Sequence, residues 1–272
     1  MAATIGDPKA LARTYDPPSV ADAYELVEQY RQVIEYSARH PNKGSSAIAN
    51  RLDLPRSRIR PWLDNENPSR PDPMRAIRQA EQLEWLNVPP DSDIARGLLT
   101  LVAWIYSGGS IDADRYVPQF AVDSERDVDR LFTAGDLVGI EFIEIDRRDS
   151  GQGREFKPAE HASLLGRLLS TLDAPVGEKA TAKDVRLPEV LDDANDDLRV
   201  AFAGTYVLNR GTRGDRPSSF LAIREERPVK YLDELARFLG DVAGTGEVRR
   251  SENNVYLDGE AAASIILHFE KL

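Results

Sequence analysis

The feature that most constrains the fold is an apolar stretch followed by a glycine turn, a plan that occurs twice. Residues 98–106 are apolar except for one threonine and lead into Gly108 and Gly109. The stretch is too short to span a bilayer and too apolar on every side for a surface helix, so it predicts a buried helix. Residues 198–211 repeat the plan. Because such a helix needs neighbours all round, the two helices are predicted to pack on each other.

The sequence around these helices repeats as well. When Gly108 is set on Asn209, an offset of 101 residues aligns the following apolar strands and helices without a gap. Self-similarity of this kind decides architecture before local detail does. Each copy predicts a helix, two strands, a helix, two strands and a helix over about 80 residues. We expect a pseudo-two-fold axis with Ala103 and Gly204 at the helix contact, because small residues let backbones approach.

The two copies resemble the tandem LAGLIDADG fold of homing endonucleases, in which two such helices pack together and end at the DNA. In that family each helix finishes in Gly-Asp-Gly-Ser-Ile or a similar sequence, and the acidic residue of each copy holds divalent metal. The first copy reads Ser-Gly-Gly-Ser-Ile over residues 107–111. It is also similar to WhiA, a bacterial sporulation-regulator family whose LAGLIDADG-like domain lacks nuclease residues and adjoins a helix-turn-helix. The resemblance covers about residues 91–272.

This resemblance implies a protein without nuclease activity. Both expected metal-binding acids are missing, replaced by Gly108 and Asn209, so no catalytic residue, metal or cofactor is expected. An alternative register places residues 111–114 on the literal Ile-Asp-Ala-Asp of the motif and makes Asp114 a metal ligand. That register would give an active DNA endonuclease. It leaves too few residues before Phe120 for a hairpin strand and breaks the offset of 101.

Composition removes several other classes. The chain has no cysteine, which excludes disulfides, thiol catalysis and thiolate zinc sites. Its three histidines, His40, His161 and His268, show no ligand spacing, so no metal site is predicted. No signal segment and no apolar run of about 20 residues is present, which predicts a cytoplasmic protein without membrane contact. No small-molecule substrate is evident. Two fused repeats predict a monomer, because they replace the dimer of single-motif relatives.

The net charge of −11 argues against a nucleic-acid partner, but its distribution does not. Residues 41–80 hold eight cations against four anions, a balance of +4, so the remainder carries −15. A chain that is acidic, free of cysteine and richer in arginine than in lysine is typical of adaptation to high salt, in which surface carboxylates hold water. We therefore expect a halophilic protein that confines its DNA contacts to a basic region.

The basic region has helix-turn-helix spacing. Residues 19–40 carry apolar side chains at intervals of three and four, which predicts a helix. Residues 45–52 predict a short second helix, a turn follows at Asp53, and Pro55 suits the first position of a third helix. The third helix is expected to bury Ile59, Trp62 and Leu63 and to end near Pro61. The expected double-stranded DNA contacts of this region are Lys43, Ser46, Arg51, Arg56, Ser57, Arg58 and Arg60.

The predicted fold class is α+β, with an N-terminal all-α helix-turn-helix domain followed by a tandem αββαββα pseudo-dimer. A helix over residues 74–86 closes the first domain, and the prolines of residues 87–90 mark a linker. The predicted divisions are a flexible arm at 1–18, the helix-turn-helix domain at 19–88, repeat 1 at 91–172, a linker at 173–187 and repeat 2 at 188–272.

In the family that the chain resembles, the strands form a saddle over the duplex, and its exposed residues touch phosphates and bases. The resemblance implies DNA contacts at Arg115, Gln119, Arg147, Arg148, Arg154, Arg213, Arg216, Arg249 and Arg250. Three hypotheses follow. The leading one is a sequence-specific DNA-binding protein, a transcription regulator with an inactive nuclease-derived fold. The alternatives are an active LAGLIDADG-type endonuclease and a protein-interaction scaffold, which the net charge favours.

Overall fold

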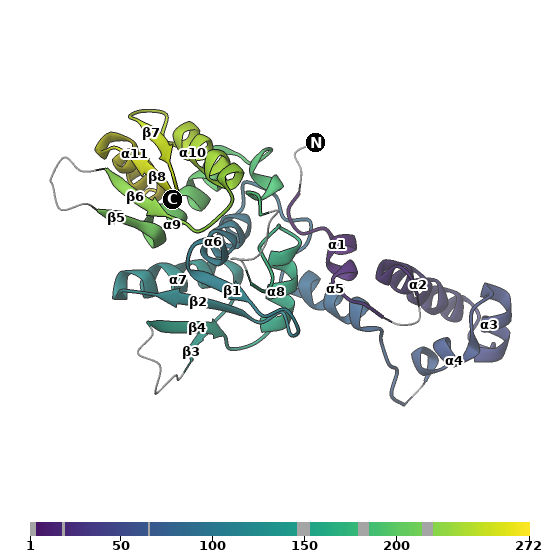
Figure 1. The fold of residues 1–272 in the computed structure, drawn as a ribbon. Coiled ribbons are helices and arrows are strands. Elements are labelled where there is room, and N and C mark those ends of the chain that lie inside the picture. The colour runs from purple at the N-terminus through teal and green to yellow at the C-terminus, as the bar shows by residue number, and fades with distance from the viewer. Residues whose placement is uncertain (1–3, 18–19, 65, 146–152, 179–184, 214–219) are drawn as a thin grey trace. The chain divides into compact units, whose positions relative to one another are not determined.

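The computed structural model describes residues 4–17, 20–64, 66–145, 153–178, 185–213 and 220–272. Its contacts divide the chain into two compact units (Figure 1). One unit is Gly6–Leu86, here called the helical unit. The other comprises Met1–Ile5 and Asn87–Leu272 and contains both repeats, so it is called the repeat unit. Among the described residues, no helix is long and apolar enough to cross a membrane.

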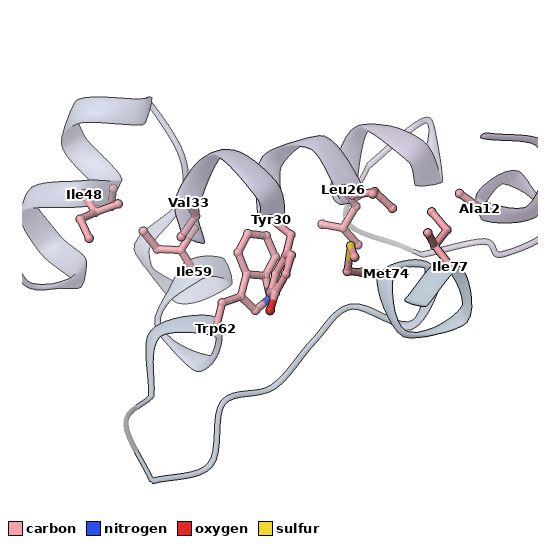
Figure 2. Packing of buried hydrophobic residues seen from close by; sticks show 11 residues of the cluster. Ala12, Leu26, Tyr30, Val33, Ile48, Ile59, Trp62, Met74 and Ile77 are labelled. Carbon is pink, nitrogen blue, oxygen red and sulfur yellow. The ribbon is translucent and has the colours of Figure 1, made fainter. Parts of the chain in front are cut away.

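The helical unit is built around a single apolar cluster (Figure 2). Tyr30 and Trp62 face each other edge to face with ring centroids 5.5 Å apart, and Ile48, Val33 and Ile59 pack beside them. Burying these large side chains is the main source of stability for so small a unit. The elements are α1 Pro8–Arg13, α2 Ala23–Arg39, α3 Ser45–Leu52, α4 Arg56–Ile59, the 3₁₀ helix η1 Pro61–Leu63 and α5 Asp72–Gln82.

The prediction that residues 1–18 form a flexible arm is wrong for the described part. Asp7 accepts the backbone N–H of Lys9 and Pro8 occupies the first turn, which starts helix α1. Leu11 and Ala12 are fully buried, and α1 packs on α2 and α5. The prolines suggested a loose segment, but Pro8 begins a helix, whose two apolar side chains complete the core.

Helix α4, the third helix predicted for this unit, ends at Ile59, close to the stop expected at Pro61. Asp53 takes a left-handed conformation (φ 53°) and turns the chain between α3 and α4. After α4 the backbone remains helical through Arg60 into η1, which buries Trp62. The predicted closing helix is also shorter than expected: α5 ends at Gln82, and the fully buried Trp85 follows outside it.

Repeat 1 follows the predicted order of elements. Its four antiparallel strands form a sheet in the order β1-β2-β4-β3, in which Phe120 pairs with Gly109 on one side and Phe156 on the other. Phe120 and Phe156 are buried against the helices. The elements are α6 Asp93–Gly108, β1 Gly109–Ile111, β2 Pro118–Val122, α7 Glu125–Val138, β3 Phe142–Glu144, β4 Arg154–Pro158 and α8 Ala162–Ser170.

Repeat 2 has the same topology, with strand order β5-β6-β8-β7. Ile223 takes the place that Phe120 has in repeat 1, because it pairs with Gly211 and with Val255. The predicted α+β class and the two αββαββα repeats are therefore confirmed. After η2 Glu189–Leu191 the elements are α9 Asp196–Arg210, β5 Gly211–Arg213, β6 Leu221–Arg224, α10 Val229–Ala243, β7 Val248–Ser251, β8 Asn254–Leu257 and α11 Gly259–Phe269.

Helices α6 and α9 lie side by side between the two sheets, as the repeated plan predicted (Figure 1). The expected role of Gly204 at their contact is wrong. A Cβ at Gly204 would lie 2.4 Å from Phe269 of α11, so this glycine makes room for the last helix. The close approach on α6 is made by Gly97, where a Cβ would lie 2.8 Å from Val138 of α7. Small residues admit these flanking helices.

The constant offset of 101 residues is also wrong, although the repeat itself is correct. The first strands begin at Gly109 and Gly211, which are 102 apart. The left-handed glycines that end α7 and α10, Gly139 and Gly244, are 105 apart. Insertions in loops shift the equivalence along the chain, because loops tolerate length changes that helices and strands do not.

The proline-rich segment after residue 86 is not a free linker at its start. Val88 is buried and exchanges two backbone hydrogen bonds with Ile5, at 2.9 and 2.7 Å. Both residues belong to the repeat unit, although the helical unit separates them in sequence. This pairing could not be predicted from the sequence, because a single bridge leaves no periodic pattern.

Candidate nucleic-acid interface

The helix-turn-helix places part of its predicted basic set on the surface. Helix α3 leads through the left-handed Asp53 to α4, where Ile59 is fully buried. Arg56, Ser57 and Arg60 are exposed on the outside of this segment. Recognition helices present donors in this manner to guanine edges and phosphates.

Arg58 departs from the prediction. Its side chain is half-buried, and Nη1 donates to Oε1 of Gln29 on α2 at 2.8 Å. Successive residues of a helix are about 100° apart, so Arg58, two residues from both Arg56 and Arg60, points to the opposite side of the segment. Arg58 therefore fastens α4 to α2 and presents less of its fork to a ligand.

The remaining predicted contacts of the helical unit are exposed. Ser46 and Arg51 lie on the surface of α3. The Lys43 ammonium donates to the hydroxyl of Tyr36 at 2.9 Å and lies 5.4 Å from the centre of that ring. This contact holds the lysine next to the amino end of α3, on the side where the helix-turn-helix begins.

Each sheet of the repeat unit has one face covered by helices and one open face. Burial alternates along the strands, with Phe120, Phe156, Ile223 and Val255 pointing to the covered side. The open faces carry the residues between them, because strand side chains alternate with a period of two. These residues are Ser110, Gln119, Ala121, Ile143, Glu155 and Lys157 in repeat 1, and Thr212, Ala222, Arg224, Arg249, Ser251, Asn254 and Tyr256 in repeat 2.

Of the predicted saddle residues, Gln119 and Arg249 lie on the open faces. The Arg249 guanidinium lies 4.8 Å from the ring centre of Phe220 and 5.5 Å from that of Tyr256. The two rings meet edge to face with centroids 6.4 Å apart. Cation–π contacts with the two rings orient the guanidinium, and its Nε lies 3.9 Å from Glu247 Oε1.

Arg154 and Arg250 are corrections, because both point to the covered faces. Arg154 pairs in register with the buried Val122 and binds Glu125 at 2.7 Å and Glu144 at 3.0 Å. These bonds raise the pKa of Arg154 above its ordinary value. Arg250 is paired with Asp233 of α10. Arg154 and Arg250 each bind an acid on a helix of the same repeat, and the strand register places neither on an open face.

Two other predicted arginines lie in a turn and at the end of a strand. Arg115 is exposed between β1 and β2, and its backbone N–H donates to Asp112 Oδ1 at 2.7 Å. Arg213 ends strand β5. Three of the predicted contacts lie outside the described residues: Arg147, Arg148 and Arg216.

Two basic residues of the open faces were missed. Lys157 and Arg224 alternate with the buried Phe156 and Ile223, and Arg224 is exposed. Counting outward positions from these buried residues would have found both. The prediction favoured the arginines of the turns and overlooked the basic residues within the strands.

At the ends of α6 and α9 the two repeats are joined by hydrogen bonds. Asn209 of α9 donates Nδ2 to Ser107 Oγ of α6 at 3.0 Å and accepts Arg130 Nη2 of α7 at 3.1 Å. Arg130 also binds Asp127 and lies 5.5 Å from the ring centre of Trp104. Burial lowers the pKa of Arg130, and Asp127 opposes this shift.

A second network lies on the repeat 2 side of these ends. The buried carboxylate of Glu225 accepts from Tyr206 at 2.7 Å, Arg210 at 3.1 Å and Arg227 at 3.4 Å. The Tyr231 hydroxyl donates to that of Tyr206 at 3.0 Å. Burial raises the pKa of both tyrosines, so both stay neutral donors. Arg227 also donates Nη2 to the Tyr106 carbonyl at 2.9 Å.

The side chains at the helix ends do not fit the divalent metal that the resemblance associates with this place. Measured from the start of the first strand, the equivalent pairs are Ser107 with Asn209 and Gly108 with Arg210. None of the four is acidic, and the amide oxygen of Asn209 is taken by Arg130. Divalent cations of this kind bind oxygen ligands, mainly carboxylates, and are repelled by guanidinium groups.

The alternative metal ligand, Asp114, lies elsewhere. Ile111 pairs with Pro118 at the end of β1, and Asp114 follows in the exposed turn, where its N–H donates to Asp112 Oδ1 at 3.2 Å. The register that aligned residues 111–114 with the end of the motif helix is therefore wrong, because these residues come after the helix. Among the described residues no group of three or more acidic or histidine side chains is placed to hold a metal ion.

A scan of protein-family models and a search of curated proteins give no match. Similar solved structures include full-length DUF199/WhiA from Thermatoga maritima, with 15% identity and a TM-score of 0.43, covering 67% of this chain. The N-terminal LAGLIDADG domain of DUF199/WhiA has 19% identity and a TM-score of 0.40, and 72% of this chain and 90% of that chain are covered. The chain spans 57% of the full-length WhiA structure. Both neighbours belong to the family that the first copy resembles.

Proposed function

We propose that this protein binds double-stranded DNA in a sequence-specific manner, as a transcription regulator, and does not cut it. The observation that carries the proposal is the helix-turn-helix of the helical unit. It exposes Arg56, Ser57 and Arg60 on one short helix, in a stretch with a charge of +4 in an otherwise acidic chain. Clustered donors on a segment of this geometry suit guanine edges and phosphates.

The open faces of the two sheets support a second, extended contact. Lys157, Arg224 and Arg249 lie on these faces with the amide of Gln119, and Arg249 is oriented by two aromatic rings. Cations on strands contact phosphates, and amide or guanidinium groups also read base edges. The repeat unit thereby adds area and direct readout to the binding of the helical unit.

The absence of cleavage is proposed from the donor set at the helix ends. An uncharged hydroxyl and an amide stand at the Ser107–Asn209 contact, and a guanidinium binds the amide oxygen. Paired carboxylates, which would hold metal at a scissile phosphate, are not among these side chains. Incubation with plasmid DNA and magnesium or manganese is expected to leave the DNA intact. Metal-dependent cutting that Asp114→Ala abolishes would restore the endonuclease hypothesis.

The binding proposal is tested by selecting duplexes from a random pool with the full chain. We expect enrichment of one defined motif and, for that motif, an affinity that exceeds the affinity for its scrambled sequence at each salt concentration. Selection at high salt is informative, because counterion release then contributes little and direct readout carries the discrimination. A pool without enrichment would favour the interaction scaffold, the class that the net charge of −11 supports.

Two further properties belong to the proposal. The acidic, cysteine-free composition suggests a working environment of high salt, and the fused repeats suggest a monomer. Light scattering coupled to gel filtration across a salt series measures both the mass and the salt range in which the protein stays folded.

A further inference from the structure

The carboxyl-terminal ends of α6 and α9 each receive an arginine from the other repeat. Arg227 of repeat 2 donates Nη2 to the carbonyl oxygen of Tyr106, one of the last four carbonyls of α6, at 2.9 Å. Arg130 of repeat 1 donates Nη2 to the side chain of Asn209, the last residue but one of α9, at 3.1 Å. The exchange is therefore reciprocal.

The helix ends need such charges. The last carbonyls of a helix lack partners within it and carry about half a negative charge, so two helices ending side by side repel each other. The Arg130 and Arg227 side chains are 19% and 5% exposed. Water screens these positions weakly, which makes the attraction between guanidinium and helix end stronger than on the surface.

Each guanidinium is held by its own acid and ring. Arg130 binds Asp127 and lies over Trp104, and Arg227 binds Glu225 with its Cζ 4.8 Å from the ring centre of Tyr231. The two arginines are not equivalent positions of the repeat, because one lies inside α7 and the other precedes α10. Arginines at non-equivalent positions of the two repeats thus supply the same positive charge to the ends of α6 and α9.

Parts of both guanidinium groups have no acceptor among the described residues. These atoms are Nε and Nη1 of Arg130 and Nη1 of Arg227, and all three are buried. A buried N–H without an acceptor destabilises the folded protein and favours any anionic oxygen placed beside it. A carboxylate introduced at Asn209 would meet Arg130 before it could meet a metal ion.

We propose that Arg130 and Arg227 are built-in counter-cations, each supplied by one repeat to the central helix of the other, and that Arg130 keeps divalent metal out of the helix ends even when acids are present. The place that holds metal in the nucleases is occupied here by the charge of the chain itself. The proposal does not depend on DNA binding.

A double-mutant cycle tests the first half. Asn209→Asp is introduced into the wild type and into Arg130→Met, and unfolding midpoints are measured in urea. Since the guanidinium can donate to the new carboxylate, we expect a small change in the wild type and a clear loss in Arg130→Met, where the acid faces the helix end alone. Arg126→Met, an exposed arginine on α7, is the matched background and should behave as the wild type. Equal shifts in all three backgrounds would overturn the proposal.

The second half is tested by manganese binding, followed by electron paramagnetic resonance without DNA. Ser107→Asp with Asn209→Asp should bind Mn²⁺ weakly, and adding Arg130→Met should tighten binding by about tenfold or more. Equal binding with and without Arg130, or none in either protein, would contradict the blocking role. Far-UV circular dichroism checks that the variants are folded. If the triple variant is unfolded, the urea unfolding cycle with Asn209→Asp and Arg130→Met tests whether Arg130 binds the introduced carboxylate.

Discussion

Arginines are placed differently in the two units. In the helical unit, Arg56 and Arg60 lie on the surface of a short helical segment. In the repeat unit, Arg130 and Arg227 are buried at the helix ends and bind Asn209 and Tyr106 of the other repeat. The comparison shows that the number of arginines in a region does not locate a DNA interface. An arginine whose N–H groups already bind a buried carboxylate or a helix-end carbonyl of the same chain has fewer donors left for a ligand.

The largest effect is expected for a buried arginine. Arg227→Met leaves Glu225 in the core with only Arg210 and Tyr206 as partners, so the repeat unit should lose about 3 kcal/mol of unfolding free energy. Arg224→Met, an exposed arginine three residues earlier, is the control and should change stability little. Urea unfolding of both variants measures the difference. Similar losses in the two would remove the distinction between buried and surface arginines.

The next effect concerns DNA affinity. Replacing Arg56, Arg58 and Arg60 by Ala should weaken binding to the selected duplex far more than replacing Arg147, Arg148 and Arg154. A lost bidentate guanine contact costs about 1 to 3 kcal/mol and relaxes specificity at one position, whereas a lost phosphate contact weakens all sequences alike and lowers the salt slope by about one. A salt series on specific and scrambled duplexes separates the two.

A control of equal charge sharpens this experiment. Arg75 and Arg78 are exposed on α5 of the same unit, so Arg75→Ala with Arg78→Ala removes two cations outside the helix-turn-helix. Arg56→Ala with Arg60→Ala removes two cations from it. If both double replacements weaken DNA binding equally and slightly, Arg56 and Arg60 are ordinary solvated surface residues. That result would favour the interaction-scaffold hypothesis.

A smaller effect separates the two faces of the sheets. Arg224→Ala with Arg249→Ala removes cations from an open face and should reduce DNA affinity and the salt slope. Arg154→Ala with Arg250→Ala removes the same charge from the covered faces, and should lower the unfolding midpoint slightly while leaving affinity nearly unchanged. Anisotropy titrations and thermal melts of both pairs provide the measurements. If the covered-face pair reduced DNA affinity more than the open-face pair, the strand register would not predict which arginines contact DNA.

The smallest effect is a pH dependence that both units should share. Backbone N–H groups of Asn67 and Glu66 hold the pKa of Asp64 below its ordinary value, and those of Ala261 and Glu247 do the same for Asp258. Because the folded pKa is depressed, this stabilisation is present above the unfolded pKa and is lost as pH falls through the folded value.

Two matched variants test the pH prediction. Asp64→Asn and Asp258→Asn should each be less stable than the wild type at neutral pH, and the difference should shrink as the pH falls below about 4. Thermal melts between pH 7 and 2 measure this difference in stability. A difference that stays constant with pH would assign the stabilisation to packing instead of charge.

Much of the fold was predictable because periodicity records burial. The apolar runs that end at Gly108 and before Gly211 indicated the paired helices, and alternation indicated the strands of both repeats. The turn at Asp53 and the stop at Pro61 were predictable for a local reason, since backbone conformation at these positions depends on few neighbours. The side chains of the candidate site were harder to predict, because the choice among the arginines of strands and turns rested on charge alone.

The sequence by itself determined the repeat, the helix-turn-helix spacing and the lack of acids at the helix ends, because each follows from the order of residue types along the chain. Only the tertiary structure decided that Arg130 crosses to Asn209, that Arg227 crosses to Tyr106 and that Arg250 turns to Asp233. These contacts join residues separated by 79, 121 and 17 positions, which no periodic pattern relates. A long side chain takes whichever partner folding brings within reach, so its role depends on the packed structure and not on its place in the chain.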